Sequence, residues 1–269
     1  MNVILVGCGN MGFAMLSGWL SAGKLKPDQV VVVEPNEGLR ARAAGLGVAT
    51  ADSAAGMPSG FAPDLVVVAV KPQVIRDVLA GYAAFGGAAT TFLSIAAGTP
   101  ISTFEDVLGA GTPVIRCMPN TPASIGKGMM VTFANPHVAA ATAHSVRDLL
   151  SASGEVAAIG SESLMDAVTA VSGSGPAYVF HFIECLTAAA QAVGLPQETA
   201  RLLAMQTVHG AAALAAESRE DPGELRRQVT SPNGTTAAAL EVLMGEDRLK
   251  KLVGEAVEAA RARSVELGK

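Results

Sequence analysis

A glycine-rich turn between an apolar strand and a helix is the feature that most constrains this chain. Residues 2–6 form an expected strand whose last four residues are apolar, and the motif Gly7-Cys8-Gly9-Asn10-Met11-Gly12 follows them at once, before a helix expected over residues 11–22. In this GxGxxG spacing the first glycine permits a tight turn, the second lets the backbone approach a pyrophosphate, and the third lets the helix pack on the strand. The free N–H groups of the helix start attract phosphate. We interpret the motif as a dinucleotide-binding turn; the alternative is an ordinary glycine-rich strand–helix turn.

Short apolar runs alternate with helical stretches through the first 160 residues. We expect strands at 2–6, 30–34, near 48, 65–70, 91–94, 114–118, 129–133 and 155–159, with further helices at 39–44 and 73–82. This alternation predicts an α/β, Rossmann-type, mostly parallel sheet with helices on both faces. The uncharged stretch 78–104 is interrupted by glycines and Pro100, which favours buried helix, loop and strand over a membrane span.

The pattern changes near residue 160, where segments rich in Ala and Leu replace the β-branched runs. Helices are expected at 163–169, 176–193, 197–217, 222–229, 235–244 and 248–267. We therefore predict two domains: residues 1–160, which bind a dinucleotide, and residues 161–269, which are all-helical.

Composition narrows the classes of partner. Lys and Arg total 19 against 24 for Asp and Glu, which argues against a nucleic-acid-binding surface. The three cysteines, Cys8, Cys117 and Cys185, form no CxxC pair, so we expect neither a disulfide framework nor a metal site. Because the start of the chain also lacks a basic segment, we expect a cytoplasmic protein with no membrane partner.

Polar residues after the predicted strands are candidates for cofactor contact. Glu34 ends the second strand, where an acid can accept hydrogen bonds from ribose hydroxyls and repel a 2′-phosphate, but Arg40 and Arg42 could reach a phosphate. Both NAD(H) and NADP(H) therefore remain open. Lys71 follows the strand 65–70 and could touch cofactor or substrate, or be a surface lysine.

Two further loops follow strands at the same edge of the sheet. The small residues Ala96, Ala97 and Gly98 leave room for a flat ring such as nicotinamide. Asn120 and Thr121 lie in a loop stiffened by two prolines and are candidates for cofactor or substrate contact. A purely structural role for that loop is the alternative.

The loop 230–236, Thr-Ser-Pro-Asn-Gly-Thr-Thr, separates two predicted helices. It combines an Asn-Gly turn, four hydroxyl side chains and the N–H groups of the helix that begins just after it. Together these groups could bind a carboxylate without any cation. The alternative interpretation is a capped turn between helices.

These stretches together resemble the pyrroline-5-carboxylate reductases, along essentially the whole chain. The matching segments are GCGNMG (7–12), AVKPQ (69–73), SIAAG (94–98), RCMPNTPASIGKG (116–128), DAVTAVSGSGPAYVF (166–180), GLPQETA (194–200) and LRRQVTSPNGTTAAAL (225–240). The resemblance implies a Rossmann domain and a helical domain that interlocks with a partner subunit into a homodimer, with decamers as the further assembly. It implies NAD(P)H-dependent reduction of 1-pyrroline-5-carboxylate to L-proline, the last step of proline biosynthesis.

The resemblance also assigns site residues. Ser231, Gly234 and Thr235 would hold the substrate carboxylate, and Thr236 would hydrogen-bond the ring nitrogen as the catalytic residue. The cofactor residues that it implies are Gly7, Cys8, Gly9, Asn10, Met11, Gly12, Ala69, Val70, Lys71, Pro72, Ala96, Ala97 and Gly98. We add Glu34 because it stands at the end of the second predicted strand.

Three positions depart from the family pattern. Asn233 replaces a glycine, and we expect the turn to survive because asparagine tolerates positive φ. Ser53 stands where many members have asparagine, and Glu34 replaces a commoner Ser, Asn or Thr. These last two weaken the usual assignment of NADPH.

The chemistry fits this set of residues. A protonated cyclic imine accepts hydride readily, so no strong general acid is required; the ring carbon must be held about 3–3.5 Å from the nicotinamide, with water excluded. Rivals are another imine reductase, a 3-hydroxyacid dehydrogenase and a non-catalytic NAD(P)-binding regulator. The dehydrogenases place Lys and Asn on the long interdomain helix, and residues 176–193 contain neither. The 230–236 loop counts against a regulator.

Overall fold

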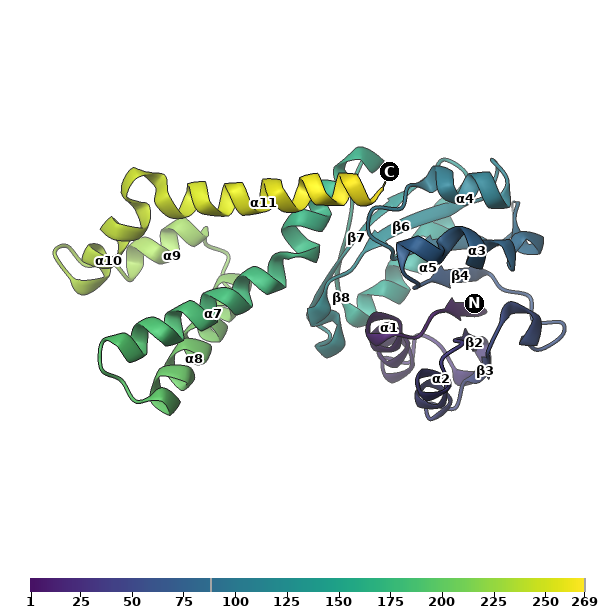
Figure 1. Cartoon of the computed structure of the whole chain (residues 1–269), viewed down its shortest axis with the longest axis horizontal. Helices are drawn as coiled ribbons and strands as arrows, with labels where there is room; N and C mark the ends of the chain where they lie inside the picture. Colours follow the sequence, from purple (N-terminus) through teal and green to yellow (C-terminus); the bar gives the residue numbers. More distant parts are fainter. Residues whose placement is uncertain (88, 269) are drawn as a thin grey trace. The chain divides into compact units, whose positions relative to one another are not determined.

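One eight-stranded sheet organises the first part of the chain in the computed structural model, which describes residues 1–87 and 89–268. The strand order is β3-β2-β1-β4-β5-β6-β7-β8, parallel throughout except where β7 runs antiparallel to β6 (Figure 1). The predicted mostly parallel sheet is confirmed. The strands are β1 (Val3–Val6), β2 (Val30–Val33), β3 (Ala49–Ala51), β4 (Leu65–Val68), β5 (Thr91–Ser94), β6 (Val114–Met118), β7 (Gly128–Ala134) and β8 (Gly154–Ala158).

Helices cover both faces of this sheet, because successive residues of a buried parallel strand point to opposite sides. From β1, Val3 and Leu5 join one apolar cluster, and Ile4 and Val6 join the other. Residues of α1 (Asn10–Ser21), α2 (Glu37–Ala44) and α5 (Ala140–Leu150) complete the first cluster. The second is completed by α3 (Ile75–Ala80) and α4 (Ile101–Leu108).

The register brings the carboxyl ends of four neighbouring strands level. Val6 at the end of β1 pairs with Val33 of β2 and with Val68 of β4, and Val68 pairs with Ser94 of β5. The segments that follow these strands therefore emerge side by side at one edge. Ligands bind at this edge in open α/β sheets.

The rest of the chain is helical, as predicted. Its helices are α6 (Met165–Val168), α7 (Gly175–Ala192), α8 (Gln197–Glu217), α9 (Pro222–Gln228), α10 (Thr235–Met244) and α11 (Arg248–Leu267). A π-helical turn, Thr169–Gly173, follows α6. No helix in the described ranges has both the length and the apolar character needed to cross a membrane.

The chain divides into two compact units at a different place from the predicted boundary at residue 160. The first unit is Met1–Ser174 with Ala260–Lys269, and the second is Gly175–Ala259. Residues 161–174 stay with the sheet because Glu162 pairs with Arg116 at 2.7 Å and Asn120 donates to the Ser172 carbonyl at 3.1 Å. The end of α11 returns to this unit, where Ser264 donates to Asp166 at 2.6 Å. Composition separates helix from strand, but it does not say which body a helix packs on.

Two helices of the first unit were not predicted. The segment that forms α4 was divided between the apolar stretch 78–104 and a loop. For the segment that forms α5 the sequence pattern predicted no helix or strand; His144 within it is exposed. Helix α5 forms because Val146, Leu149 and Leu150 make a buried stripe at helical spacing.

Candidate active site

The glycine-rich turn has the geometry that its motif predicts. Gly7 has φ +87°, and a Cβ there would lie 2.7 Å from the Ala69 carbonyl oxygen. A Cβ on Gly12 would lie 2.5 Å from the Gly7 carbonyl oxygen, so both positions require glycine. A Cβ on Gly9 would have no neighbour within 4 Å. The turn is therefore tightly packed on its inner side and open at Gly9, where a pyrophosphate would need close access.

Helix α1 begins in this turn and supplies anion-binding groups. Gly9 is the N-cap, and the first hydrogen bond within the helix joins Phe13 N–H to the Gly9 carbonyl at 2.9 Å. The N–H groups of Asn10, Met11 and Gly12 precede that bond and have no carbonyl partner within the helix. The first turn contains no acidic residue. This helix start thus fits a diphosphate.

Glu34 is held beside the turn. Its Oε2 accepts a hydrogen bond from Cys8 N–H at 2.7 Å and its Oε1 accepts one from Asn36 N–H at 2.9 Å. The residue is only 7% exposed. Arg40 Nη1 donates to the carbonyls of Glu34 and Pro35 at 2.8 and 2.9 Å. The carboxylate is therefore fixed at the end of β2, where the ribose of a dinucleotide is recognised.

A cavity of about 360 Å³ opens between the ends of β1, β2 and β4. Gly7, Ser53 and Tyr82 line it together with two carboxylates, Asp52 and Asp77. Its walls, as far as the structure describes them, include no lysine or arginine. Burial raises the pKa of the Tyr82 phenol well above its usual value. The cavity fits a neutral nucleoside better than a phosphorylated one.

The other predicted cofactor segments lie at the same edge, after β4 and β5. Lys71 is exposed, while Ala96 is buried and donates its N–H to Ser94 Oγ at 3.3 Å. Gly98, at φ +74°, lies against the end of α11: its added Cβ would sit 3.2 Å from Gly268 N. Pro72 and Gly98 line one cavity of about 350 Å³. The structure thus brings all the predicted cofactor segments to four adjacent strand ends.

The predicted substrate residues lie together in the second unit. Asn233 has φ +59°, which confirms that asparagine accommodates this turn. Gly234 N–H donates to the Ser231 carbonyl at 3.1 Å, and Gly234 is the N-cap of α10, so Thr235 and Thr236 occupy its first turn. Thr230 Oγ1 donates to the Arg226 carbonyl at 2.6 Å. For the Thr236 hydroxyl the described residues provide no hydrogen-bond partner, which leaves it available to a ligand.

Asn120 has a structural role. Its amide donates to the Ser172 carbonyl at 3.1 Å, and its oxygen accepts from Met129 N–H at 2.9 Å, so the side chain braces two segments.

Sequence reasoning missed the two carboxylates of the nucleoside cavity, Asp52 and Asp77. They come from segments that only tertiary packing brings to the glycine turn, and nothing in their local sequence marks them.

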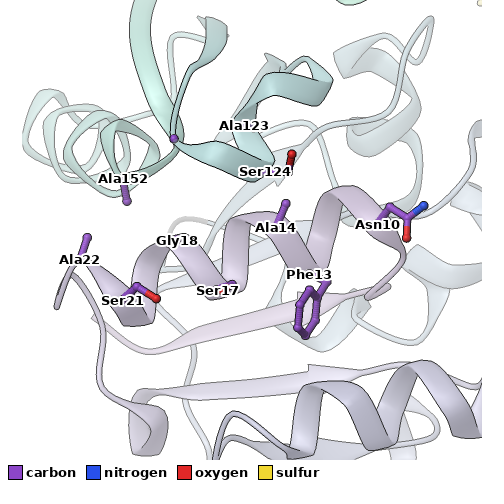
Figure 2. Close-up of a pocket in the computed structure, with 11 residues that line it drawn as sticks. Asn10, Phe13, Ala14, Ser17, Gly18, Ser21, Ala22, Ala123, Ser124 and Ala152 are labelled. Atoms are coloured by element: carbon purple, nitrogen blue, oxygen red, sulfur yellow. The ribbon is translucent and has the colours of Figure 1, made fainter. Parts of the chain in front are cut away.

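A third, open cavity of about 650 Å³ runs along α1, from Asn10 to Ala22 (Figure 2). Figure 2 shows Ala123 and Ser124 on one side of α1 and the ring of Phe13 leaving the helix on the other. Small side chains such as Ala14 and Ser17 line it.

Within the described ranges no group of three His, Cys, Asp or Glu side chains could hold a metal ion.

The buried thiols should be unreactive in the folded protein. Burial raises the pKa of Cys8 to about 11 and that of Cys117 to about 12. At pH 8 only about one Cys8 thiol in a thousand would be the reactive thiolate, and access is blocked as well. We expect a disulfide reagent at pH 8 to leave both residues unmodified until the protein is unfolded, as mapped by mass spectrometry. Modification of Cys8 at the rate seen in guanidinium would contradict its buried position.

Comparison with known proteins connects both units to one family. Residues 162–267 match the family model described as pyrroline-5-carboxylate reductase dimerisation, and residues 2–98 match the one described as NADP oxidoreductase, coenzyme F420-dependent. The pyrroline-5-carboxylate reductase of Pseudomonas aeruginosa is 40% identical over 99% of this chain and 96% of its own. That of Corynebacterium melassecola is 39% identical over 100% of this chain and 99% of its own.

Solved structures agree. A pyrroline-5-carboxylate reductase from Coxiella burnetii superposes with a TM-score of 0.92 at 35% identity, covering 100% of this chain and 98% of that one. The Plasmodium falciparum pyrroline carboxylate reductase with NADP bound gives 0.86 at 29% identity, covering 100% and 98%. Because the similarity spans both units at these identities, the chain belongs to the pyrroline-5-carboxylate reductase family.

Proposed function

We propose that this protein reduces the C=N bond of 1-pyrroline-5-carboxylate to give L-proline, with NAD(P)H as the cofactor. Family membership supports the reaction. The observation that supports NAD(P)H binding is the register of β1, β2, β4 and β5, whose carboxyl ends lie level. This register brings the glycine turn, Glu34 and the two loops after β4 and β5 to one edge of the sheet. The substrate residues Ser231, Gly234, Thr235 and Thr236 are part of the proposal.

The side chains divide the work between binding and orientation. Bound NAD(P)H supplies the hydride. The N–H groups at the start of α10 would hold the substrate carboxylate, and the Thr236 hydroxyl would hydrogen-bond the ring nitrogen and help keep its proton in place. An imine protonated at nitrogen needs no further electrophilic activation, so positioning is the main contribution of these residues.

The direct test is oxidation of NADH or NADPH by the purified protein with pyrroline-5-carboxylate, followed by absorbance. We expect turnover that depends on the imine and yields proline. Turnover with a 3-hydroxyacid and NAD⁺ but not with the imine would favour the dehydrogenase alternative. Cofactor binding without turnover of either substrate would favour a regulator.

Asp52 and Asp77 line the proposed nucleoside cavity, and Glu34 stands between two further lining residues, Val33 and Pro35. From these three carboxylates we infer a preference for NADH over NADPH. Glu34→Gln keeps an oxygen that can accept from Cys8 N–H but removes the charge. We expect it to raise the ratio of kcat/KM for NADPH to that for NADH by about tenfold, the effect of losing about 1.4 kcal/mol of repulsion.

The exposed Glu37, three residues away, provides the matched control. Glu37→Gln makes the same charge change outside the cavity and should leave the cofactor ratio unaltered. An equal response of the two variants, or none in Glu34→Gln, would refute the role of Glu34. A native preference for NADPH would instead point to Arg40 of α2, whose guanidinium donates to the Glu34 carbonyl.

We also propose that the second unit completes its core with a partner subunit, forming the interlocked homodimer. Among its described residues only Ala200 and Ala204 are buried hydrophobics. Large apolar side chains are exposed on α7, α8, α10 and α11, among them Phe180, Phe182, Leu202, Leu203, Met205, Val242, Leu252 and Val253. Such a surface is unstable in water without a partner. Light scattering after gel filtration should give at least a dimer, and it will decide whether dimers assemble into decamers.

A further inference from the structure

Arg42 binds the glycine turn through two of its carbonyl oxygens. Its Nη2 donates to the carbonyl oxygens of Cys8 and Gly9 at 3.2 and 3.3 Å. Arg42 lies on α2, so these bonds connect a second helix to the turn that opens α1. A guanidinium donor makes such bonds stronger than neutral ones.

The two carbonyls determine where the neighbouring N–H groups point. In a trans peptide the C=O and the following N–H point in opposite directions. The Cys8 carbonyl shares its peptide plane with the N–H of Gly9, and the Gly9 carbonyl shares its plane with the N–H of Asn10. Binding of both carbonyls by Arg42 therefore directs these two N–H groups away from the guanidinium. The space beside Gly9 is open, since a Cβ there would have no neighbour within 4 Å.

The guanidinium is itself fixed in place. Its carbon lies 4.0 Å from the centre of the Phe13 ring, which leaves α1 on the side away from Ala123 and Ser124 (Figure 2). Its Nε is buried and finds no hydrogen-bond partner in the ranges that the structure describes. A stacked, partly desolvated cation is held in one orientation and keeps more of its electrostatic effect than an exposed one.

We infer that Arg42 is a positioning residue for the cofactor diphosphate: it orients the Gly9 and Asn10 N–H groups for binding and places a positive charge behind the turn. The inference rests on the proposed cofactor site. Because it acts on the diphosphate, which NADH and NADPH share, the effect must be the same for both. A direct contact between Arg42 and a 2′-phosphate would instead affect NADPH alone.

The test is titration of NADH and NADPH fluorescence on the full-length protein without the imine, using three variants. Arg42→Gln should raise the Kd for NADH and for NADPH by the same factor, about tenfold. Arg42→Met keeps a long apolar stem against Phe13 but no donor, and should bind as weakly. Arg42→Lys keeps the charge but cannot bridge both carbonyls and stack, so it should lie between wild type and Arg42→Met. The KM for pyrroline-5-carboxylate should stay unchanged.

The exposed Arg147 on α5 gives the control, since Arg147→Gln removes the same charge elsewhere on the sheet-bearing unit. The inference is overturned by wild-type affinity in Arg42→Met, which would reduce Arg42 to packing, or by a change confined to NADPH. If Arg42→Gln fails to fold, the comparison of lysine and methionine decides: tighter binding by Arg42→Lys supports the inference and equal binding refutes it. Because binding is measured without substrate, failure of the proposed reaction would be seen separately.

Discussion

Replacing Thr236 with alanine is expected to lower kcat/KM for pyrroline-5-carboxylate by about tenfold to a thousandfold, the range for loss of one polar contact or proton-transfer aid in a transition state. Thr236 lies in the first turn of α10, and the described residues leave its hydroxyl without a hydrogen bond. Thr236→Ser should recover most of the activity, since it restores the hydroxyl. Cofactor affinity should not change in either variant.

Thr230 is the matched control for this experiment. It lies in the same loop and has the same side chain, but its hydroxyl is bonded to the Arg226 carbonyl. Thr230→Ala should cost some stability and leave kcat/KM within about threefold, because no ligand contact is lost. A loss as large as that of Thr236→Ala would show that both variants distort the loop. Unchanged kinetics in Thr236→Ala would remove this residue from the mechanism.

The sequence predicted the strands and helices correctly where the local hydrophobic pattern and the tertiary packing agree. Buried parallel strands are continuous apolar runs, so β1 and β4 were predicted to within two residues of their ends. Helix α4 was missed although Pro100 precedes it and Phe104 and Leu108 are spaced for one face. Its apolar sequence merges with that of β5, and periodicity in a continuously apolar stretch does not distinguish the two.

The candidate site divides in the same way. The glycine turn and the 230–236 loop were found because backbone conformation demands particular residues there, as at Gly7 and Asn233. Asp52, Asp77 and the bracing function of Arg42 were not found, because they depend on how distant segments meet. The change of pattern near residue 160 stays a predicted domain boundary and lies beside the start of the matched dimerisation model at residue 162. The compact units divide after Ser174 instead, because whether a helix packs on the sheet depends on contacts such as Glu162 with Arg116.

Gly12 and Gly9 of the turn should differ in how much stability an alanine substitution costs. At Gly12 an added Cβ would meet the Gly7 carbonyl at 2.5 Å, so Gly12→Ala must displace backbone. We expect it to lower the free energy of unfolding by about 1–3 kcal/mol, measured by urea denaturation. At Gly9 the Cβ meets nothing within 4 Å, and φ −63° suits alanine, so Gly9→Ala should fold as stably as wild type.

Gly9→Ala should instead weaken cofactor binding, because the space beside Gly9 is where a diphosphate must approach the N–H groups of α1. A methyl group there is expected to raise the Kd for both NADH and NADPH about tenfold or more while the protein stays fully folded. Gly111→Ala, at an equally open position in the turn before β6, controls for the substitution itself and should leave cofactor affinity unchanged. Undiminished cofactor affinity in Gly9→Ala would place the diphosphate elsewhere, since an unobstructed turn is the property on which the cofactor site depends.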